Sequence, residues 1–434
     1  MSNKAKKARN FAALSGTALV AAPLMTSGVA SADAYTVTNL AASGDGSLLK
    51  AIEDANSHPG ADTITFQAGL SGTITLGGDA LYITESVTIT GPGSSLVTID
   101  ADGADNPVFY TRDQTGEGTI AISGLTLTGV DGDTYGSFNI WGDDVTLTDI
   151  VLTGNTAGYS GGIYFDGSYD GDAGTLTIRN STISGNEGTD YTGGVYVTDG
   201  GSAADPVFIM TDSTVSGNIG ADYGGGLYFE SGIAGDIVIA NSTISGNTAG
   251  AGGGIYIEGS ANSDVELLIS SSTIVGNSVT GYGGGLYIGS TFLGDVTISN
   301  SVITGNTAAS DGDDIYVTSD STVTANYSLI GEVVGTTLAG ANNIAGDPDP
   351  MLGALENNGG STKTHLPQAG SPLIDAGDPL FGVEPSAAAY PTTDQRGYAR
   401  VYNSVIDIGA VEVGPATLPP TGGSNGLMAT IGAG

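Results

Sequence analysis

The sequence predicts an all-β fold, a right-handed parallel β-helix of three-strand coils of about 30 residues, with a short N-terminal capping helix. The first observation is a repeat, in which a segment similar to Ser-Thr-Ile-Ser-Gly-Asn ends at intervals of 31, 32, 29, 30 and 29 residues. A segment similar to Gly-Gly-Ile-Tyr-Val follows each time. The repeated residues are Asn155, Asn186, Asn218, Asn247, Asn277 and Asn306, and Tyr164, Tyr196, Tyr228, Tyr256, Tyr287 and Tyr316.

The second observation is the pattern of the short apolar segments between the turns. Triplets such as Leu81-Tyr-Ile, Val87-Thr-Ile and Ile120-Ala-Ile place two apolar residues on one face of a strand and one residue on the other. Three triplets in about 30 residues, joined by turns too short for helices, predict a three-sided coil. Parallel connections of this kind are right-handed.

The third observation is composition. Glycine supplies 72 of 434 residues without a collagen-like period, which suits many tight turns. The formal charge of -36 becomes -40 without the first 32 residues, which hold four of the ten basic residues and no acidic one, leaving 6 basic against 46 acidic. Such a surface argues against nucleic acid or anionic membranes as partners. The chain has no cysteine, so no disulfides hold it together.

Residues 1–32 are typical of a secretory signal peptide. Lys4, Lys6, Lys7 and Arg9 precede an apolar stretch from Phe11 to about Met25, and small residues at positions 30–32 form a cleavage site. The apolar stretch is too short for a membrane anchor and contains Pro23. We expect a secreted or cell-surface protein with no transmembrane span in the mature chain.

Residues 33–66 are predicted to cap the first coil. Ser47 is a helix N-cap, and Leu48, Leu49, Ile52 and Ala55 share one helix face, which would protect the open sheet edge. The segment Val-Thr-Asn-Leu-Ala-Ala-Ser-Gly-Asp-Gly-Ser-Leu-Leu-Lys-Ala-Ile-Glu-Asp-Ala-Asn resembles the N-terminal cap of bacterial CSLREA-type β-helix proteins.

Residues 67–331 are predicted to form the β-helix. Its Gly-Asn and Gly-Gly repeats resemble those of polymorphic outer-membrane and other bacterial surface β-helix proteins. We expect the polar residues of the turn after the second strand to form an internal hydrogen-bonded ladder. These residues are Asp149, Asn180, Asp212, Asn241, Ser271, Asn300 and Asn326.

Residues 332–413 depart from the repeat. Five landmarks occur in order, Asp347-Pro-Asp-Pro, Leu355-Glu-Asn-Asn-Gly-Gly, Gly370-Ser-Pro-Leu-Ile-Asp, Asp394-Gln-Arg-Gly and Asp407-Ile-Gly-Ala-Val-Glu. Together they resemble the choice-of-anchor Q module at the ends of surface β-helix proteins. We expect a cap over the last coil, in which Arg396 holds the carboxylates of Asp375, Asp407 and Glu412. A catalytic role for this group is the alternative.

Residues 414–434 form a linker that contains Leu418, Pro419, Pro420, Thr421 and Gly422. This LPxTG-like motif resembles the sortase sorting signal, which implies sortase and the cell wall of a Gram-positive bacterium as partners. The family pattern also has an apolar span and a basic end, but only residues 423–434 follow here, without Lys or Arg. Relative to that pattern we expect a truncated C-terminus, and a chance Pro/Thr-rich pentapeptide is the alternative.

The repeated tyrosines are the predicted ligand-binding residues. Strand alternation directs Tyr164, Tyr196, Tyr228, Tyr256, Tyr287 and Tyr316 outwards along one face, with Tyr159, Tyr191, Tyr223 and Tyr282 in the neighbouring loops. An aromatic stripe bordered by carboxylates suits a long uncharged polysaccharide or cell-surface glycan. Stacking that only stabilises the sheet is the alternative.

The sequence also offers candidate catalytic residues. Glu230 and Glu258 occupy the same outward column one coil apart, which suits a hydrolase, and Asp313-Asp314 replaces a Gly-Gly pair. β-Helix lyases use an Arg or Lys base, but between Lys50 and Lys363 the chain has only Arg112 and Arg179. Paired acidic residues on turns also suit Ca²⁺, although no spacing matches a known calcium loop.

These patterns favour an exported surface protein that adheres to polysaccharide or to cells without catalysis. A polysaccharide-degrading hydrolase or lyase working in the same face is the alternative, and a passive surface scaffold is a further one. The residues do not indicate an oligomeric state or a particular ligand.

Overall fold

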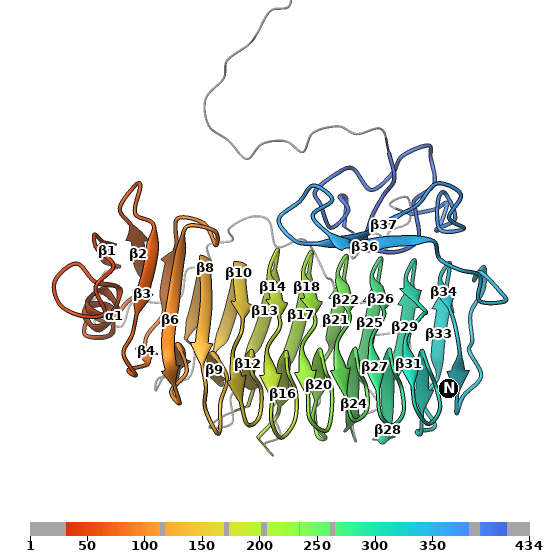
Figure 1. Ribbon diagram of the computed structural model, residues 1–434, viewed down its shortest axis with the longest axis horizontal. Coiled ribbons are helices and arrows are strands. Elements are labelled where there is room, and N and C mark those ends of the chain that lie inside the picture. The colour runs from red at the N-terminus through yellow and green to blue at the C-terminus, as the bar shows by residue number, and fades with distance from the viewer. Residues whose placement is uncertain are drawn as a thin grey trace, which may run out of the picture.

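The computed structural model describes residues 32–112, 118–168, 173–200, 206–233, 235–260, 265–381 and 391–414. Residues 1–31 of the predicted signal peptide and the whole sorting motif, Leu418 to Gly422, lie outside this range. The described chain forms the predicted right-handed parallel β-helix, seen in Figure 1 as a row of stacked coils. Among the described residues, no helix is both long and apolar enough to span a membrane.

Three parallel sheets form the sides of the coil, and we name them the tyrosine sheet, the short sheet and the long sheet. Ten strands form the tyrosine sheet: β4 (Leu81–Ile83), β7 (Phe109–Thr111), β9 (Phe138–Trp141), β12 (Ile163–Asp166), β16 (Val195–Thr198), β20 (Leu227–Phe229), β24 (Ile255–Ser260), β28 (Leu286–Phe292), β32 (Ile315–Val317) and β35 (Val333–Val334). Six form the short sheet: β11 (Thr156–Ala157), β15 (Glu187–Gly188), β19 (Ile219–Gly220), β23 (Thr248–Ala249), β27 (Ser278–Val279) and β31 (Thr307–Ala308).

The long sheet receives two strands from each complete coil of the repeat. Its nineteen strands are β1 (Ala34–Val37), β2 (Asp62–Phe66), β3 (Gly72–Thr75), β5 (Val87–Thr90), β6 (Val97–Ala104), β8 (Thr119–Val130), β10 (Asp144–Thr153), β13 (Thr175–Arg179), β14 (Thr182–Ser184), β17 (Val207–Thr211), β18 (Thr214–Ser216), β21 (Ile237–Ala240), β22 (Thr243–Ser245), β25 (Glu266–Ser270), β26 (Thr273–Val275), β29 (Asp295–Ser299), β30 (Val302–Ile303), β33 (Val323–Asn326) and β34 (Leu329–Ile330). β10 is one bent strand that pairs with both β13 and β14 of the next coil.

The core lies inside the coils, as the alternation predicts. Each coil places an equivalent apolar residue of the tyrosine sheet in the interior, and one such column is fully buried over six coils. Parallel pairing in register stacks each residue on its equivalent in the next coil. This column consists of Ile163, Val195, Leu227, Ile255, Leu286 and Ile315.

The N-terminal capping helix is present as α1, Leu48–Asn56. The Ser47 hydroxyl accepts a hydrogen bond from the Lys50 backbone N–H at 3.1 Å, as expected for an N-cap. Ala51 and Ile52 are buried against the first coil, and Leu49 is only half-buried. The helix therefore lies over the end of the sheet, where it covers the core of the first coil.

The expected ladder of turn residues is wrong in its position. Asp149, Asn180, Asp212, Asn241, Ser271 and Asn300 bend the long sheet with φ between 46° and 54°, and in the last coil Tyr327 rather than Asn326 does so. Asn and Asp adopt this left-handed conformation more readily than most residues. The ladder at this turn is instead made by the next residue, a buried serine. The members are Ser181, Ser213, Ser242, Ser272, Ser301 and Ser328, each accepting a backbone N–H of the preceding coil.

A second buried ladder is made by the asparagines that close the repeat. In each coil a glycine with φ between 62° and 68° turns the chain, and the following asparagine points inwards. Each side-chain amide donates to the side-chain oxygen of the next asparagine at 2.9–3.0 Å, and that oxygen also accepts the backbone N–H. The ladder ends at Asp314, which accepts both bonds from Asn306.

The C-terminal segment does not cap the last coil as expected. Residues 333–344 continue the solenoid through β35 and isolated bridges. Residues 347–381 and 391–414, here called the strap, then run back along the outer side of the long sheet (Figure 1). They include the antiparallel pair β36 (Leu352–Glu356) and β37 (Thr364–Pro367). The side of the solenoid, and not its end, receives the strap.

Small polar and apolar side chains on the long sheet hold the strap. Gln395 bonds Thr243 at 2.6 Å, and Leu373 and Ile408 cover Val302. Arg396 pairs with Asp394 at 2.8 Å and donates to the backbone oxygens of Asn358 and Glu412, so it does not hold the expected carboxylates. The carboxylates of Asp407 and Glu412 instead accept backbone N–H groups of the strap.

The cation among these strap carboxylates is Arg400, which the sequence interpretation missed. Its guanidinium is fully buried, and burial lowers its pKa, although the negative charges of Asp394, Glu412 and Asp407 act in the opposite direction. Arg400 donates to the backbone oxygens of Gly409 and of Ser271, a long-sheet residue. This arginine therefore ties the strap to the solenoid, which supports a structural role for the segment.

Candidate functional site

The predicted column of tyrosines exists and is in register. Tyr164 pairs with Tyr196, Tyr196 with Tyr228, and the pattern continues to Tyr256, Tyr287 and Tyr316. Successive ring centroids lie 4.5–5.6 Å apart. All six side chains point away from the core of the solenoid, as strand alternation requires.

These tyrosines do not form the open face that the sequence suggested. Tyr164 is 9% exposed, Tyr196 3%, Tyr228 2% and Tyr256 8%, because a second aromatic layer covers them. Tyr287 and Tyr316 are half-buried. The loop before each tyrosine strand folds over the column, and alternation within a strand carries no information about what lies above the strand.

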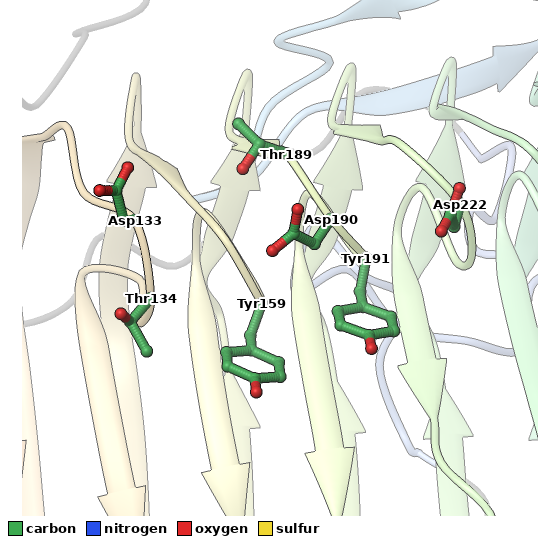
Figure 2. Close-up of a pocket in the computed structure, with 7 residues that line it drawn as sticks. All are labelled: Asp133, Thr134, Tyr159, Thr189, Asp190, Tyr191 and Asp222. Atoms are coloured by element: carbon green, nitrogen blue, oxygen red, sulfur yellow. The ribbon is translucent and has the colours of Figure 1, made fainter.

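The covering layer consists of half-buried loop tyrosines and one tryptophan. Tyr159 and Tyr191 stack with centroids 5.4 Å apart and ring planes 4° from parallel, and Figure 2 shows both rings side by side. Each also contacts the column beneath, as in the 5.7 Å contact between Tyr159 and Tyr164. The members are Tyr135, Trp141, Tyr159, Tyr191 and Tyr223, with the exposed Tyr282 further along.

Two hollows flank this layer, and we call them together the tyrosine groove. The larger, of about 550 Å³, is lined by residues of the loops that precede the tyrosine strands. Three aspartates, from three of four successive coils, lie along it, as Figure 2 shows. Its lining is Asp133, Thr134, Tyr159, Thr189, Asp190, Tyr191 and Asp222.

The smaller hollow, of about 390 Å³, lies towards the ends of the tyrosine strands. It shares Tyr159 with the larger hollow, and its lining includes Asp199 and Glu230, the carboxylates that directly follow β16 and β20. The lining of both hollows contains aromatic rings, hydroxyls and carboxylates, and no lysine or arginine. The remaining lining residues here are Tyr164, Tyr196, Thr198, Gly200 and Ser231.

Glu230 and Glu258, the predicted catalytic pair, bond to tyrosines of the column. The Tyr228 hydroxyl donates to a Glu258 oxygen at 2.7 Å, and Tyr196 bonds Glu230 in the same manner. Burial raises the pKa of both tyrosines, and the adjacent carboxylates raise it further. Each glutamate therefore holds a neutral phenol of the preceding coil, and only Glu230 lines a hollow.

The carboxyl group of Asp166, in the same region, has a raised pKa. It lies at the end of β12, it is buried, and burial raises its pKa, with Asp199 and Glu230 adding further negative potential. A hydrogen bond from the Ser168 N–H at 3.3 Å acts in the opposite direction. A carboxyl group of this kind holds its proton at a higher pH than a solvent-exposed aspartate does.

Asp313 and Asp314, the other predicted catalytic pair, lie at neither hollow. One Asp314 oxygen ends the asparagine ladder and the other accepts the Glu332 N–H at 3.0 Å, while Asp313 accepts the Ala308 N–H at 2.7 Å. These contacts give both residues a role in ending the repeat.

The described ranges contain no group of three or more His, Cys, Asp or Glu side chains placed to hold a metal ion. The acidic turns that suggested Ca²⁺ therefore do not form such a cluster within these ranges. Sequence interpretation also missed Tyr135, Trp141 and the loop aspartates. The Asp-Tyr dipeptides at 190–191 and 222–223, each five residues before a column tyrosine, were the available signal.

Comparison with known proteins identifies the fold. Residues 140–327 match a family model described as the right handed beta helix region. A crystal structure of pectate lyase Pel9A is similar over 89% of this chain and 97% of that chain, with 15% sequence identity and a TM-score of 0.47. No curated protein sequence matches significantly. The family match over residues 140–327 agrees with the right-handed parallel β-helix that the structure shows.

Proposed function

We propose that the protein is an exported cell-surface protein that binds polysaccharide in the tyrosine groove without cleaving it. The observation that carries this proposal is the stacked outer layer of Tyr159, Tyr191 and Tyr223, repeated coil by coil and flanked by two hollows. Aromatic rings supply apolar faces for sugar rings, and their hydroxyls supply polar contacts. A chain of repeating sugars along the solenoid axis would meet an equivalent tyrosine in each of these coils.

The electrostatics of the groove restrict the class of glycan. Asp133, Asp190 and Asp222 line one hollow and Asp199 and Glu230 the other, with no cation in either lining. Like charges oppose association with a polyuronate or a sulfated chain. Neutral or amine-bearing glycans therefore fit the groove better than acidic ones.

The bonding of Glu230 and Glu258 favours binding over catalysis. Both carboxylates accept tyrosine hydroxyls, which fixes the rings of the column. A residue that stabilises the aromatic layer in this manner is a positioning residue for binding. It is not free to transfer a proton without breaking that bond.

Asp166 supports glycoside hydrolysis as a second candidate function. Its raised pKa suits a general acid, and Asp199 and Glu230 are nearby carboxylates of the kind that activates water or attacks a sugar. This candidate differs from the sequence-based pair of Glu230 and Glu258 because it includes Asp166 and leaves out Glu258. A passive scaffold with no ligand is the remaining alternative.

The test incubates the purified protein with soluble and insoluble polysaccharides, with calcium and with a chelator. It measures both retained protein and newly released sugar ends. Binding predicts retention without new ends, and hydrolysis predicts new ends that Asp166→Asn abolishes. If the protein is not retained and no new sugar ends are released, the passive scaffold is the interpretation that remains. The calcium and chelator arms test whether Ca²⁺, which the acidic turns of the sequence suggested, takes part in binding.

A matched pair of variants tests the groove itself. Tyr191→Ala removes one outer ring and should weaken retention several-fold, because one aromatic contact of several is lost. Tyr402→Ala removes an exposed tyrosine of the strap and should leave retention unchanged. Equal retention by both variants would exclude the groove as the binding surface.

We also propose that residues 1–32 direct export and that Leu418 to Gly422 attach the protein to a Gram-positive cell wall through sortase. Both segments carry the sequence features of such signals. Cell fractionation of the source organism, with and without Thr421→Ala, tests the attachment. Equal wall-bound fractions for both would contradict it.

A further inference from the structure

One residue breaks the tyrosine column. In β9 the position between Tyr110 and Tyr164 is Asn139, which pairs in register with both. It therefore points outwards into the aromatic layer, like the tyrosines of the following coils. Its side chain is fully buried.

Neither polar atom of the Asn139 side chain has a hydrogen-bond partner among the described residues. An asparagine amide offers two donors and one acceptor, and a buried amide without partners destabilises the folded protein. By contrast, the inward asparagines that close the repeat are bonded at both side-chain atoms in a continuous ladder. The unpaired amide at this position therefore calls for a partner from outside the chain.

The surroundings of Asn139 are aromatic. The ring centroid of Trp141 lies 6.5 Å from that of Tyr110 and 5.8 Å from that of Tyr164. Tyr110 and Tyr164 are the two in-register neighbours of Asn139, so the indole bridges the rings on either side of the asparagine. Tyr135 contacts Trp141 at 5.8 Å and Tyr164 at 4.9 Å. Both covering rings are half-buried, and a ligand reaches the fully buried amide only when one of them turns aside.

The loop that leads into β9 lines one end of the larger hollow. Asp133 and Thr134, which line that hollow, belong to the loop that carries Tyr135 and leads into β9. A glycan in the groove that extends towards the N-terminal coils reaches this loop after Tyr159.

We propose that Asn139, with Trp141 and Tyr135, forms a subsite for the acetamido group of an N-acetylated sugar. This inference rests on the proposed glycan binding and names the class of sugar. An acetamido group has one N–H and one C=O, which complement the side-chain oxygen and amide N–H of asparagine. Its methyl group packs on the indole and phenol rings. A hydroxyl at the same sugar position donates and accepts through a single oxygen atom, so it does not present a separate N–H and C=O to the two polar atoms of the asparagine.

The test uses two β-1,4-linked hexamers, of N-acetylglucosamine and of glucose, which differ only in the acetamido group at carbon 2. Trp141 is the only tryptophan in the sequence, so its fluorescence reports events at the subsite directly. We expect a change in Trp141 emission with the acetylated hexamer and about tenfold tighter binding of it, as a site with buried unpaired groups discriminates against a ligand that leaves them unpaired.

Asn139→Leu keeps a side chain of similar size and removes both polar atoms. It should abolish the preference for the acetylated hexamer while binding of the glucose hexamer stays within about twofold. Asn139→Ala gives the same comparison if the leucine variant does not fold, and Asn106→Leu, an exposed asparagine of a neighbouring coil, is the matched control that keeps the preference.

The outcomes separate this inference from the proposed function. Equal binding of the two hexamers, sensitive to Tyr191→Ala, would overturn the acetamido subsite and leave the groove as a glycan site. Preference for the acetylated hexamer that survives in both Asn139 variants would overturn it as well. If the wild-type protein binds neither hexamer, the proposed function is overturned. A stronger Trp141 response to an N-acetylated peptide than to either hexamer would overturn the assignment to sugars.

Discussion

Replacement of Asn247 by alanine tests the asparagine ladder, the feature that links the coils through their interior. Asn247 is fully buried. Its side-chain oxygen accepts the backbone N–H and the side-chain amide of Asn218, both at 3.0 Å. Its amide donates to the Val215 oxygen at 3.0 Å and to the Asn277 side chain at 2.9 Å. The substitution removes these four hydrogen bonds.

The expected loss of stability follows from these contacts. At about 1 kcal/mol for each hydrogen bond, Asn247→Ala should lower the free energy of unfolding by about 4 kcal/mol. The backbone N–H of Asn218 also becomes a buried polar group without a partner, so the larger values of the usual range apply. The backbone bond from Asn247 to the Asn277 side chain remains.

Urea unfolding followed by far-ultraviolet circular dichroism measures the effect. The matched control is Thr248→Ala, an exposed residue in the same turn, which should change the free energy of unfolding by less than about 1 kcal/mol. A solenoid transmits stability between neighbouring coils, so a second, earlier transition in the Asn247 variant would also agree with the ladder. A loss below about 1 kcal/mol with an unchanged slope would refute the reasoning.

Three further predictions concern the strap and the groove. Burial lowers the pKa of His365, which bonds Ser245 and Gly353, so its contribution to stability is present above about pH 6.5 and is lost as the pH falls below that value. Burial raises the pKa of Glu412 to about 8, an effect of opposite sign. The free energy of unfolding of wild type minus that of His365→Gln should therefore fall from pH 7.5 to 5.5, and a constant difference would contradict the prediction. Arg400→Met should destabilise the strap by about 3 kcal/mol or more, because buried carboxylates lose their cation. Limited proteolysis measures this effect, and the strap of the variant should be cleaved faster. An unchanged cleavage rate would argue against a role of Arg400 in holding the strap. Tyr228→Phe removes the bond to Glu258 and should cost about 1 kcal/mol in thermal unfolding, and an unchanged melting temperature would show that the bond contributes nothing.

The regular part of the fold was predictable because it repeats. A side-chain period of two within each strand and a period of about 30 between coils directed Ile163 inwards and Tyr164 outwards, as observed. The capping helix followed from local rules, since Ser47 and the apolar face of α1 lie within a few residues of one another. Local patterns of this kind do not depend on distant parts of the chain.

The errors concern contacts between distant or irregular segments. Asn180 and its equivalents and the true ladder serines are adjacent in sequence, and only the left-handed backbone at the turn decides which side chain points inwards. The strap lies along the solenoid because Gln395 and Arg400 meet partners 129 to 182 residues away, a relation that no period reveals.

The sequence by itself determined the solenoid, its handedness, its N-terminal helix and the existence of a tyrosine column. Only the tertiary structure decided what a ligand meets. The loops before the tyrosine strands vary in length, so their course over the sheet depends on packing and not on strand alternation. That packing buries the predicted column, exposes the edges of Tyr159 and Tyr191 to two acidic hollows, and leaves the amide of Asn139 without a partner beneath Trp141.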